Sequence, residues 1–248
     1  MALYKVTLAY DGTDFYGFQR QAQVRTVQNE FEKILKKLGW KDNSILAAGR
    51  TDAGVHASRQ VISFSLDWKH SSESLRNAIN AHLPFDIAAV HVGEVHIGFN
   101  PRYDALARKY IYRIYCQEVS NPLLNRYAWQ VWPTVDLQFM QKAAGLLIGE
   151  HDFASFGKPF QKNGTTIRKV ISADWSQLKE GHYLFCIIAN AFLYHLVRRL
   201  VFLMVRIGQG RILTRDFGDE LKVQTSNLLP GIAPAYGLEL AQVMYEKT

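Results

Sequence analysis

A loop from Ala48 to Ala57 carries the residue types and spacing best suited to chemistry. Between Gly49 and Gly54 stand one carboxylate, Asp52, and one guanidinium, Arg50. Glycine at each end lets the backbone turn sharply or approach another backbone closely. Strand-like runs flank the loop, and catalytic groups commonly lie on loops that a rigid scaffold holds. Taken alone, the pattern also fits a tight turn in which Asp52 caps its own backbone.

The composition limits the class of protein. The chain has 248 residues, 48% of them hydrophobic, and a formal net charge of +7. This length fits one large domain or two ordinary ones, and the positive charge favours a polyanionic partner such as nucleic acid. The sequence has no metal-ligand spacing, dinucleotide-binding fingerprint or phosphate-binding loop, so we expect neither a metal nor a cofactor.

Three further features bear on location. Met1 to Tyr10 has strand character without a basic leader, so we expect no signal peptide. The longest apolar stretch, Ala191 to Ile207, is interrupted by one histidine and three arginines and is not expected to span a membrane. Cys116 and Cys186 stand apart in strand-like runs, and we expect both to be buried, reduced thiols of a cytoplasmic protein.

The first half, residues 1–101, shows a regular alternation of elements. The apolar spacing predicts a strand at 4–10, a helix at 27–38 with Thr26 as its N-cap, a short run at 45–48, a strand at 61–66, a helix from Ser71 or Ser72 to Pro84, and a strand at 87–95. This order, β-α-β-β-α-β, is that of the ferredoxin-like fold, in which two helices cover one face of an antiparallel sheet.

The second half, residues 102–248, repeats this order with insertions. We expect strands at 108–116, 167–176, 183–189 and 237–245, and helices at 136–148, 192–207 and 214–223. Lys158 to Lys169 forms a basic, glycine-containing loop between two of these elements. It fits a solvated connector and an RNA-contacting loop equally well.

Several stretches together resemble the tRNA pseudouridine synthase A family. They are the run Gly-Arg-Thr-Asp-Ala-Gly-Val-His-Ala at 49–57, Tyr10 to Gln21, Asn190 to Arg198, and Pro234 to Leu240. The resemblance implies an α+β fold in which two ferredoxin-like halves form the pseudouridine synthase fold, with a mainly antiparallel sheet and flanking helices. It also implies isomerisation of uridine to pseudouridine in the anticodon stem and loop of tRNA, by a homodimer.

The resemblance also assigns roles to residues. It makes Asp52 the nucleophile, Arg198 its ion-pair partner and Tyr110 the side chain that stacks on the target base. Leu238 supports that tyrosine. Arg50, beside the nucleophile, is expected to fill the space of a flipped-out base.

The residues themselves leave alternatives for some of these assignments. An arginine in an apolar helix is costly unless an anion meets it, or unless its head reaches the surface. We expect the first for Arg198 and the second for Arg199. A strand tyrosine is often plain core packing, which we expect of Tyr112, and by pattern alone Leu238 is an ordinary core leucine.

The sequence departs from the family pattern at three places. Phe18 stands where tryptophan is frequent, Leu196 replaces a frequent methionine, and Phe202 replaces a common glycine. We expect Phe202 to change helix packing or a subunit contact without displacing the site residues.

Two other classes of protein remain open on sequence grounds. A non-catalytic RNA-binding module fits the charge and the doubled ferredoxin-like order, but it gives no reason for Asp52 in its glycine frame. A glycosidase needs a second carboxylate, for which Asp11 and Asp14 are the candidates. For the isomerase, attack at C6 of the base or at C1′ of the sugar is open, and Tyr110 is the nearest candidate to remove the C5 proton.

Overall fold

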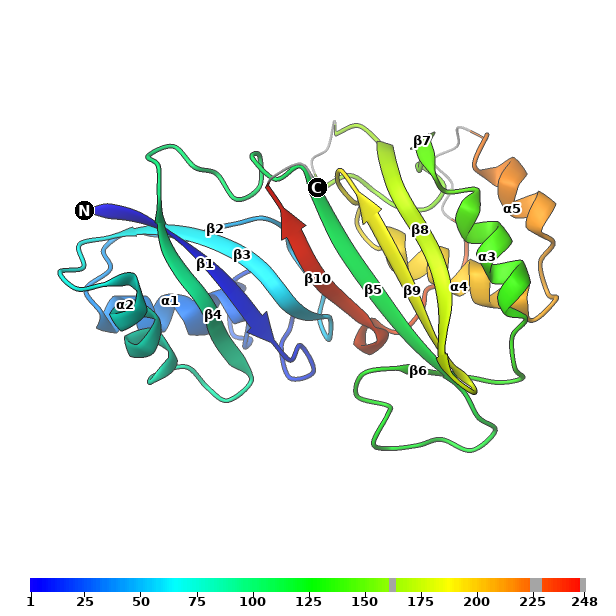
Figure 1. Ribbon diagram of the computed structural model, residues 1–248, viewed down its shortest axis with the longest axis horizontal. Coiled ribbons are helices and arrows are strands. Elements are labelled where there is room, and N and C mark those ends of the chain that lie inside the picture. Colours follow the sequence, from blue (N-terminus) through cyan, green and yellow to red (C-terminus); the bar gives the residue numbers. More distant parts are fainter. Residues whose placement is uncertain (161–163, 224–228, 246–248) are drawn as a thin grey trace. The chain divides into compact units, whose positions relative to one another are not determined.

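The computed structural model describes residues 1–160, 164–223 and 229–245 (Figure 1). The chain divides into two compact units, Met1–Leu106 with Glu239–Thr248, and Ala107–Leu238. The division differs from the expected halves 1–101 and 102–248 mainly at the C-terminus, because the last strand, β10, belongs to the first unit. That strand pairs with a strand far away in sequence, which local patterning does not indicate.

The first unit has the expected ferredoxin-like order. It comprises β1 (Ala2–Tyr10), α1 (Val27–Lys37), β2 (Leu46–Ala47), β3 (His56–Leu66), α2 (Ser72–Asn80) and β4 (Ile87–Val95). The strands follow the order β4-β1-β3-β2, and each neighbouring pair is antiparallel. Strand β10 (Leu238–Met244) pairs in parallel with the start of β3, with Glu239 opposite His56.

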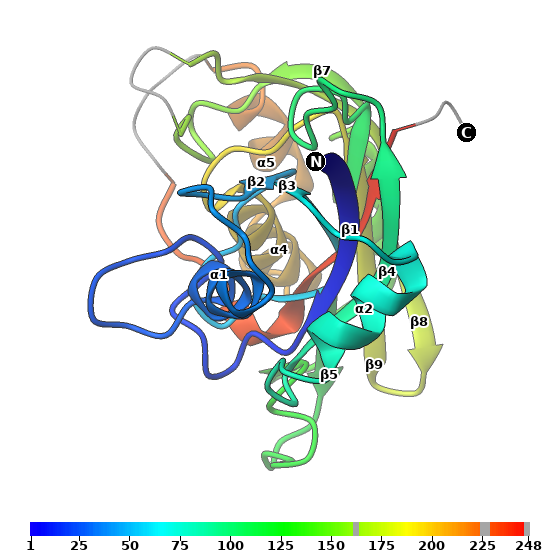
Figure 2. The same cartoon turned by 90° about the vertical axis from the view of Figure 1, so that its left-hand side faces the viewer.

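The helices of this unit begin where their capping residues predict. The Thr26 side chain accepts a hydrogen bond from the Asn29 amide, and the Ser71 side chain accepts one from the Ser74 amide, which confirms both N-caps. Helix α1 packs Phe31 against Phe64 of β3, with the ring centres 6.0 Å apart. Helix α2 lies beside β4 (Figure 2).

The second unit contains more strands than the sequence predicts. Its elements are β5 (Ala107–Cys116), β6 (Trp129–Val131), α3 (Leu137–Gly145), β7 (Gly149–Asp152), β8 (Ile167–Lys179), β9 (His182–Ala189), α4 (Leu196–Gly208), α5 (Thr214–Glu220) and a 3-10 turn at Ala235–Gly237. The antiparallel order is β5-β9-β8-β7, and β6 runs parallel to the end of β5. Strands β6 and β7 were not expected, and β7 makes three strands, not two, between α3 and α4.

Helix α4 starts four residues later than its apolar spacing suggests. The Tyr194 amide donates to the Lys158 carbonyl at 2.9 Å, which holds this segment beside another chain segment. His195 then adopts a left-handed conformation with φ 65° before the helix begins at Leu196. A side chain added at Gly157 would place its Cβ 2.7 Å from the Cβ of Leu193, so glycine permits this close approach.

Two further expectations can be compared with the structure. Within the described ranges, no helix is both long and apolar enough to cross a bilayer. Cys116 and Cys186 are free thiols, but both are half-buried and not fully buried as expected. Cys186 lies on the more exposed face of β9, where residues alternate between buried and half-buried. Burial raises the pKa of both thiols.

Candidate active site

The loop that carries Asp52 connects β2 to β3 and is tied to β3 by main-chain contacts. The Ala48 amide donates to the Val61 carbonyl at 2.9 Å. Beyond the loop's centre, the Val55 amide donates to the Asp52 carbonyl at 3.2 Å and closes a tight turn, with Gly54 at φ 78°. The turn that the glycines predict therefore forms with Asp52 as one of its residues.

The segment after β1 packs directly on this loop. The Phe18 amide donates to the Thr51 carbonyl at 3.0 Å, and the Gly54 amide donates to the Phe15 carbonyl at 3.2 Å. A Cβ at Gly17, which has φ +88°, would lie 2.9 Å from the Thr51 oxygen, and one at Gly12 would lie 2.1 Å from the Val55 oxygen. Both glycines are therefore needed for the two segments to touch.

Three buried polar side chains hold the loop from the interior of the unit: Thr51 of the loop itself, Tyr10 of β1 and Gln60 of β3. The hydroxyls of Tyr10 and Thr51 are 2.8 Å apart, and the Gln60 amide nitrogen donates to the Gly49 carbonyl at 2.9 Å. Gln60 also hydrogen-bonds to Tyr10. Burial raises the pKa of Tyr10 to about 12, although its hydrogen bonds with Thr51 and Gln60 oppose this shift. The Tyr10 hydroxyl therefore keeps its proton at neutral pH.

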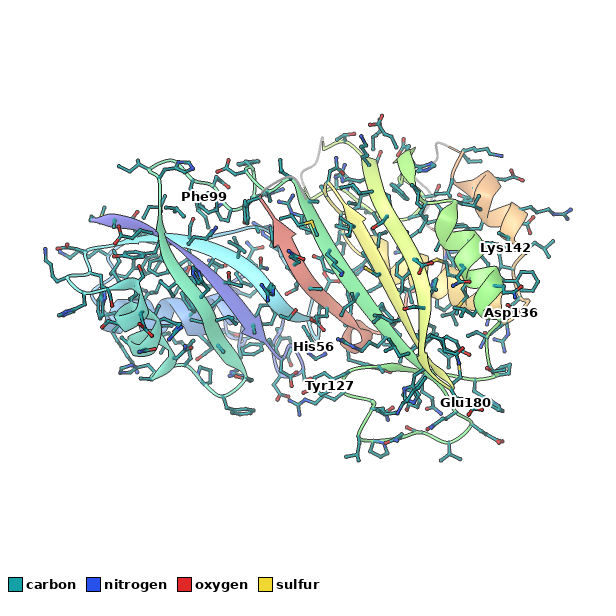
Figure 3. All side chains as sticks on the ribbon, in the orientation of Figure 1. His56, Phe99, Tyr127, Asp136, Lys142 and Glu180 are labelled. Carbon is teal, nitrogen blue, oxygen red and sulfur yellow. The ribbon has the colours of Figure 1, made fainter. Side chains whose placement is uncertain are left out.

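His56 occupies the end of the loop, at the first residue of β3 (Figure 3). Its Nδ1 accepts a hydrogen bond from the Gly12 amide at 3.0 Å and lies 3.2 Å from the Asp11 carboxylate. The same carboxylate oxygen accepts from the amide and the hydroxyl of Thr13. Asp11 is thus engaged in the turn after β1, which does not favour it as the second carboxylate of a glycosidase.

Two ion pairs also anchor the segment that follows β1. Arg25 donates two hydrogen bonds to buried Asp86, at 2.7 and 2.8 Å, and its guanidinium lies 4.1 Å from the centre of the Phe15 ring. The bonds to Asp86 raise the pKa of Arg25. Arg20 pairs with buried Glu32 of α1 at 2.6 Å. The segment that supports the loop is therefore anchored to Asp86, the residue before β4, and to α1.

The side chains proposed for chemistry on this loop reach its surface. Asp52 is half-buried and Arg50 is exposed, whereas Thr51 between them is buried. Asp52 and Arg50 are thus presented by a fixed backbone, which is the arrangement that a nucleophile and its neighbour require.

The second unit contains the two tyrosines that the sequence distinguishes. Tyr112 of β5 is fully buried and donates to the Pro234 carbonyl at 2.7 Å, which confirms its place in the core. Burial raises the pKa of Tyr112 well above its usual value, and the charge of Arg198 opposes this shift. Tyr110 on the same strand is half-buried and meets Phe192 edge-on, with ring centres 4.9 Å apart.

The adjacent arginines of α4 both bind the segment that follows residue 228. Arg198 Nε donates to the Ala233 carbonyl at 2.8 Å, and the Ala233 amide donates back to the Arg198 carbonyl at 3.1 Å. Arg199 donates to the Leu229 carbonyl at 2.5 Å. The expectation that Arg199 extends into solvent is therefore wrong. Burial lowers its pKa, as does neighbouring Arg198, because this backbone segment covers the side chain.

Phe202, one of the three departures from the family pattern, packs against the same segment. Its ring is stacked on Trp129, with centres 6.3 Å apart and planes 11° from parallel. A Cβ at Gly231, which has φ +91°, would lie 2.1 Å from the Phe202 ring. The large side chain on α4 thus faces a glycine on the segment opposite. Leu238, at the end of this segment, is buried.

The predicted site residues fall into two groups. The loop of the first unit brings Asp52 and Arg50 together, while Tyr110, Arg198 and Leu238 belong to the second unit. The pairing of Asp52 with Arg198 stays a prediction. Sequence reasoning missed Gln60 under the loop, because Gln60 precedes the predicted strand at 61–66 and follows Arg59, so no local pattern marked it as buried.

Comparisons with known proteins identify the family of the chain. The family model described as tRNA pseudouridine synthase matches residues 7–104 and 143–246. The chain therefore belongs to the tRNA pseudouridine synthase family and is an isomerase that acts on uridine in tRNA. This decides against a non-catalytic RNA-binding module and against a glycosidase.

Relatives of similar length make the match more specific. The chain is 41% identical to a tRNA pseudouridine synthase A of Fervidobacterium nodosum, over 97% of this chain and 98% of that one. It is 37% identical to a tRNA pseudouridine synthase A of Chloroflexus aurantiacus, over 96% and 87% respectively. A solved Cbf5-Nop10-Gar1 complex is 13% identical with a TM-score of 0.37, covering 82% of this chain and 45% of that one.

Proposed function

We propose that this chain converts uridine to pseudouridine in the anticodon stem and loop of tRNA, with Asp52 as the nucleophile. The observation that carries the proposal is the anchored loop at residues 48–57. Its backbone is held at the Thr51 carbonyl and at Val55, while the Asp52 side chain remains half-exposed. A carboxylate held in one place is suited to forming a covalent intermediate with a substrate.

The reaction rearranges bonds within one nucleotide. Asp52 bonds to the uridine at C6 or at C1′, and the glycosidic bond between N1 and C1′ breaks. The base turns, C5 bonds to C1′, and the bond between Asp52 and the nucleotide breaks, which frees the carboxylate. The C5 proton leaves and N1 takes up a proton. Atoms and electrons balance without an oxidant or a phosphate donor, so the proposal invokes no cofactor.

The other predicted residues prepare the substrate for this step. A base inside a stem must leave the helix before a side chain can reach it. Exposed Arg50 occupies the space that the base leaves, and Tyr110 stacks on the extruded base, supported by Leu238. Arg198 pairs with Asp52 and directs its carboxylate. The motifs that resemble the tRNA pseudouridine synthase A family also support a homodimer that clamps tRNA.

Release of tritium tests the proposal directly. A tRNA transcript labelled with tritium at C5 of its uridines should lose label to water when it is incubated with the protein. The Asp52→Asn variant should release none, because the amide keeps the shape of the side chain and removes the nucleophile.

Two controls separate the parts of the proposal. tRNA binding by Asp52→Asn should be nearly unchanged, since phosphate contacts dominate affinity. A transcript whose anticodon stem and loop lack uridine should release no label. Release from that transcript would contradict the assigned site, and turnover by Asp52→Asn would remove Asp52 from its role.

A further inference from the structure

The polar cluster under the loop, made of Tyr10, Thr51 and Gln60, lies in the interior of the first unit. The exposed fraction is 5% for Tyr10, 7% for Thr51 and 0% for Gln60. Burying hydroxyl and amide groups costs stability unless each finds a partner, and apolar side chains of similar volume often pack equally well. A satisfied polar cluster at this place therefore calls for a reason other than stability.

The hydrogen bonds of the cluster connect all three side chains. The Gln60 side-chain nitrogen donates to the Gly49 carbonyl at 2.9 Å, and the Gln60 side chain also hydrogen-bonds to Tyr10. The hydroxyls of Tyr10 and Thr51 are 2.8 Å apart, and either can be the donor of the bond between them. The Gln60 oxygen accepts from the Val61 amide at 3.1 Å, which fixes the amide against rotation.

The cluster contacts the loop on both sides of Arg50. Gln60 holds the main chain at Gly49, and Tyr10 holds the side chain of Thr51. The Thr51 carbonyl is held separately by the Phe18 amide. Thr51 is thus fixed through its side chain and its main chain, which leaves little freedom for Asp52, the next residue.

We propose that Tyr10 and Gln60 are positioning residues that, through Thr51 and Gly49, set the place of Asp52 and Arg50 for the isomerisation. The inference rests on the proposed function. Neither residue touches the substrate, and each acts through the backbone of the loop. Buried hydrogen-bond networks of this kind give a unique geometry, which apolar packing of the same volume does not.

Conservative variants test this role. Tyr10→Phe and Thr51→Val each remove one hydroxyl from the same hydrogen bond, and Gln60→Leu removes the amide. Single-turnover isomerisation, corrected for the folded fraction, should slow about 10- to 100-fold in each, because small displacements of a reacting group cost up to this much. The Kd for tRNA should change less than about twofold, because phosphate contacts carry affinity.

Two features distinguish positioning from general stability. Thr51→Ser keeps the hydroxyl and should keep a near-normal rate. The double variant Tyr10→Phe with Thr51→Val should be no slower than the slower single variant, because both remove one shared interaction.

A matched control lies on the same strand. Tyr4 of β1 is also buried, and its hydroxyl contacts Glu94 at 3.4 Å, away from the loop. Tyr4→Phe should leave the rate unchanged.

Rates within about threefold of the unaltered chain in Tyr10→Phe and Gln60→Leu would overturn the inference, as would additive effects in the double variant. An unaltered chain that releases no tritium would instead overturn the proposed function.

Discussion

At the scale of single residues, the two units use arginine in different ways. In the first unit, Arg25 and Arg20 each meet a buried carboxylate, and these pairs hold the segment that supports the loop. In the second unit, Arg198 and Arg199 each donate to a main-chain carbonyl. The bond from Arg198 Nε to the Ala233 carbonyl fixes the plane of the guanidinium, which suits its proposed role of directing the Asp52 carboxylate.

Replacing each of the two adjacent arginines by methionine separates structure from catalysis. Both Arg198→Met and Arg199→Met remove a charged donor from a carbonyl and should lower the free energy of unfolding by roughly 1.5–3 kcal/mol. Only Arg198→Met should also slow single-turnover isomerisation, by roughly 100-fold, because only Arg198 is proposed to direct Asp52. Urea unfolding and tritium release provide the two measurements. Equal rates for both folded variants would contradict the pairing of Arg198 with Asp52.

At the scale of elements, the contact between α4 and the segment after residue 228 depends on one glycine. Gly231→Ala would bring a Cβ against the Phe202 ring and place alanine at φ +91°. We expect a loss of roughly 2–4 kcal/mol in the free energy of unfolding, from overpacking and from the unfavourable backbone conformation together.

The Phe202→Ala background tests the cause of this loss. Without the large ring, Gly231→Ala should cost only the backbone part, roughly 1–2 kcal/mol, measured by urea unfolding. An equal cost in both backgrounds would show that the Phe202 ring moves aside freely. The unaltered chain, the two single variants and the double variant form a double-mutant cycle. This cycle measures how far Gly231 accommodates Phe202, which stands where the family pattern commonly has glycine.

The elements that could be predicted from sequence are those with local signals. Thr26 and Ser71 cap helices through their own side chains, and alternating apolar residues mark β1 and β4. Strand β7 was missed because Gly149–Asp152 has neither alternation nor β-branched residues, and it forms only against β8. The late start of α4 depends on contacts between Lys158 and Tyr194, which are far apart in sequence.

The same distinction applies to the candidate site. Asp52 and Arg50 could be named as candidates because a contiguous motif carries them, and their chemical roles stay predictions. The positioning roles of Tyr10 and Gln60 depend on two strands meeting under the loop, and no spacing along the chain indicates that meeting. Arg199 was placed wrongly because a helical pattern alone does not show the segment that covers this side chain.

At the scale of the whole molecule, the net charge of +7 bears on how the substrate is held. A protein that neutralises phosphates releases the counterions condensed on the nucleic acid, so affinity falls as salt rises. Two exposed lysines are candidates for such contacts: Lys158 at the start of the basic segment and Lys169, which the structure places on β8. Part of that segment, residues 161–163, lies outside the described residues.

The salt dependence of tRNA binding measures this contribution. If about five phosphates are contacted, raising salt from 50 to 200 mM should weaken binding by roughly two to three decades. Asp52→Asn should show the same slope, because the proposed nucleophile makes no phosphate contact. If the basic loop touches RNA, Lys158→Ala combined with Lys169→Ala should lower the slope by about two and weaken binding across all transcripts. An unchanged slope would make the loop a solvated connector, and a flat profile for the unaltered chain would show that its positive charge does not hold the tRNA.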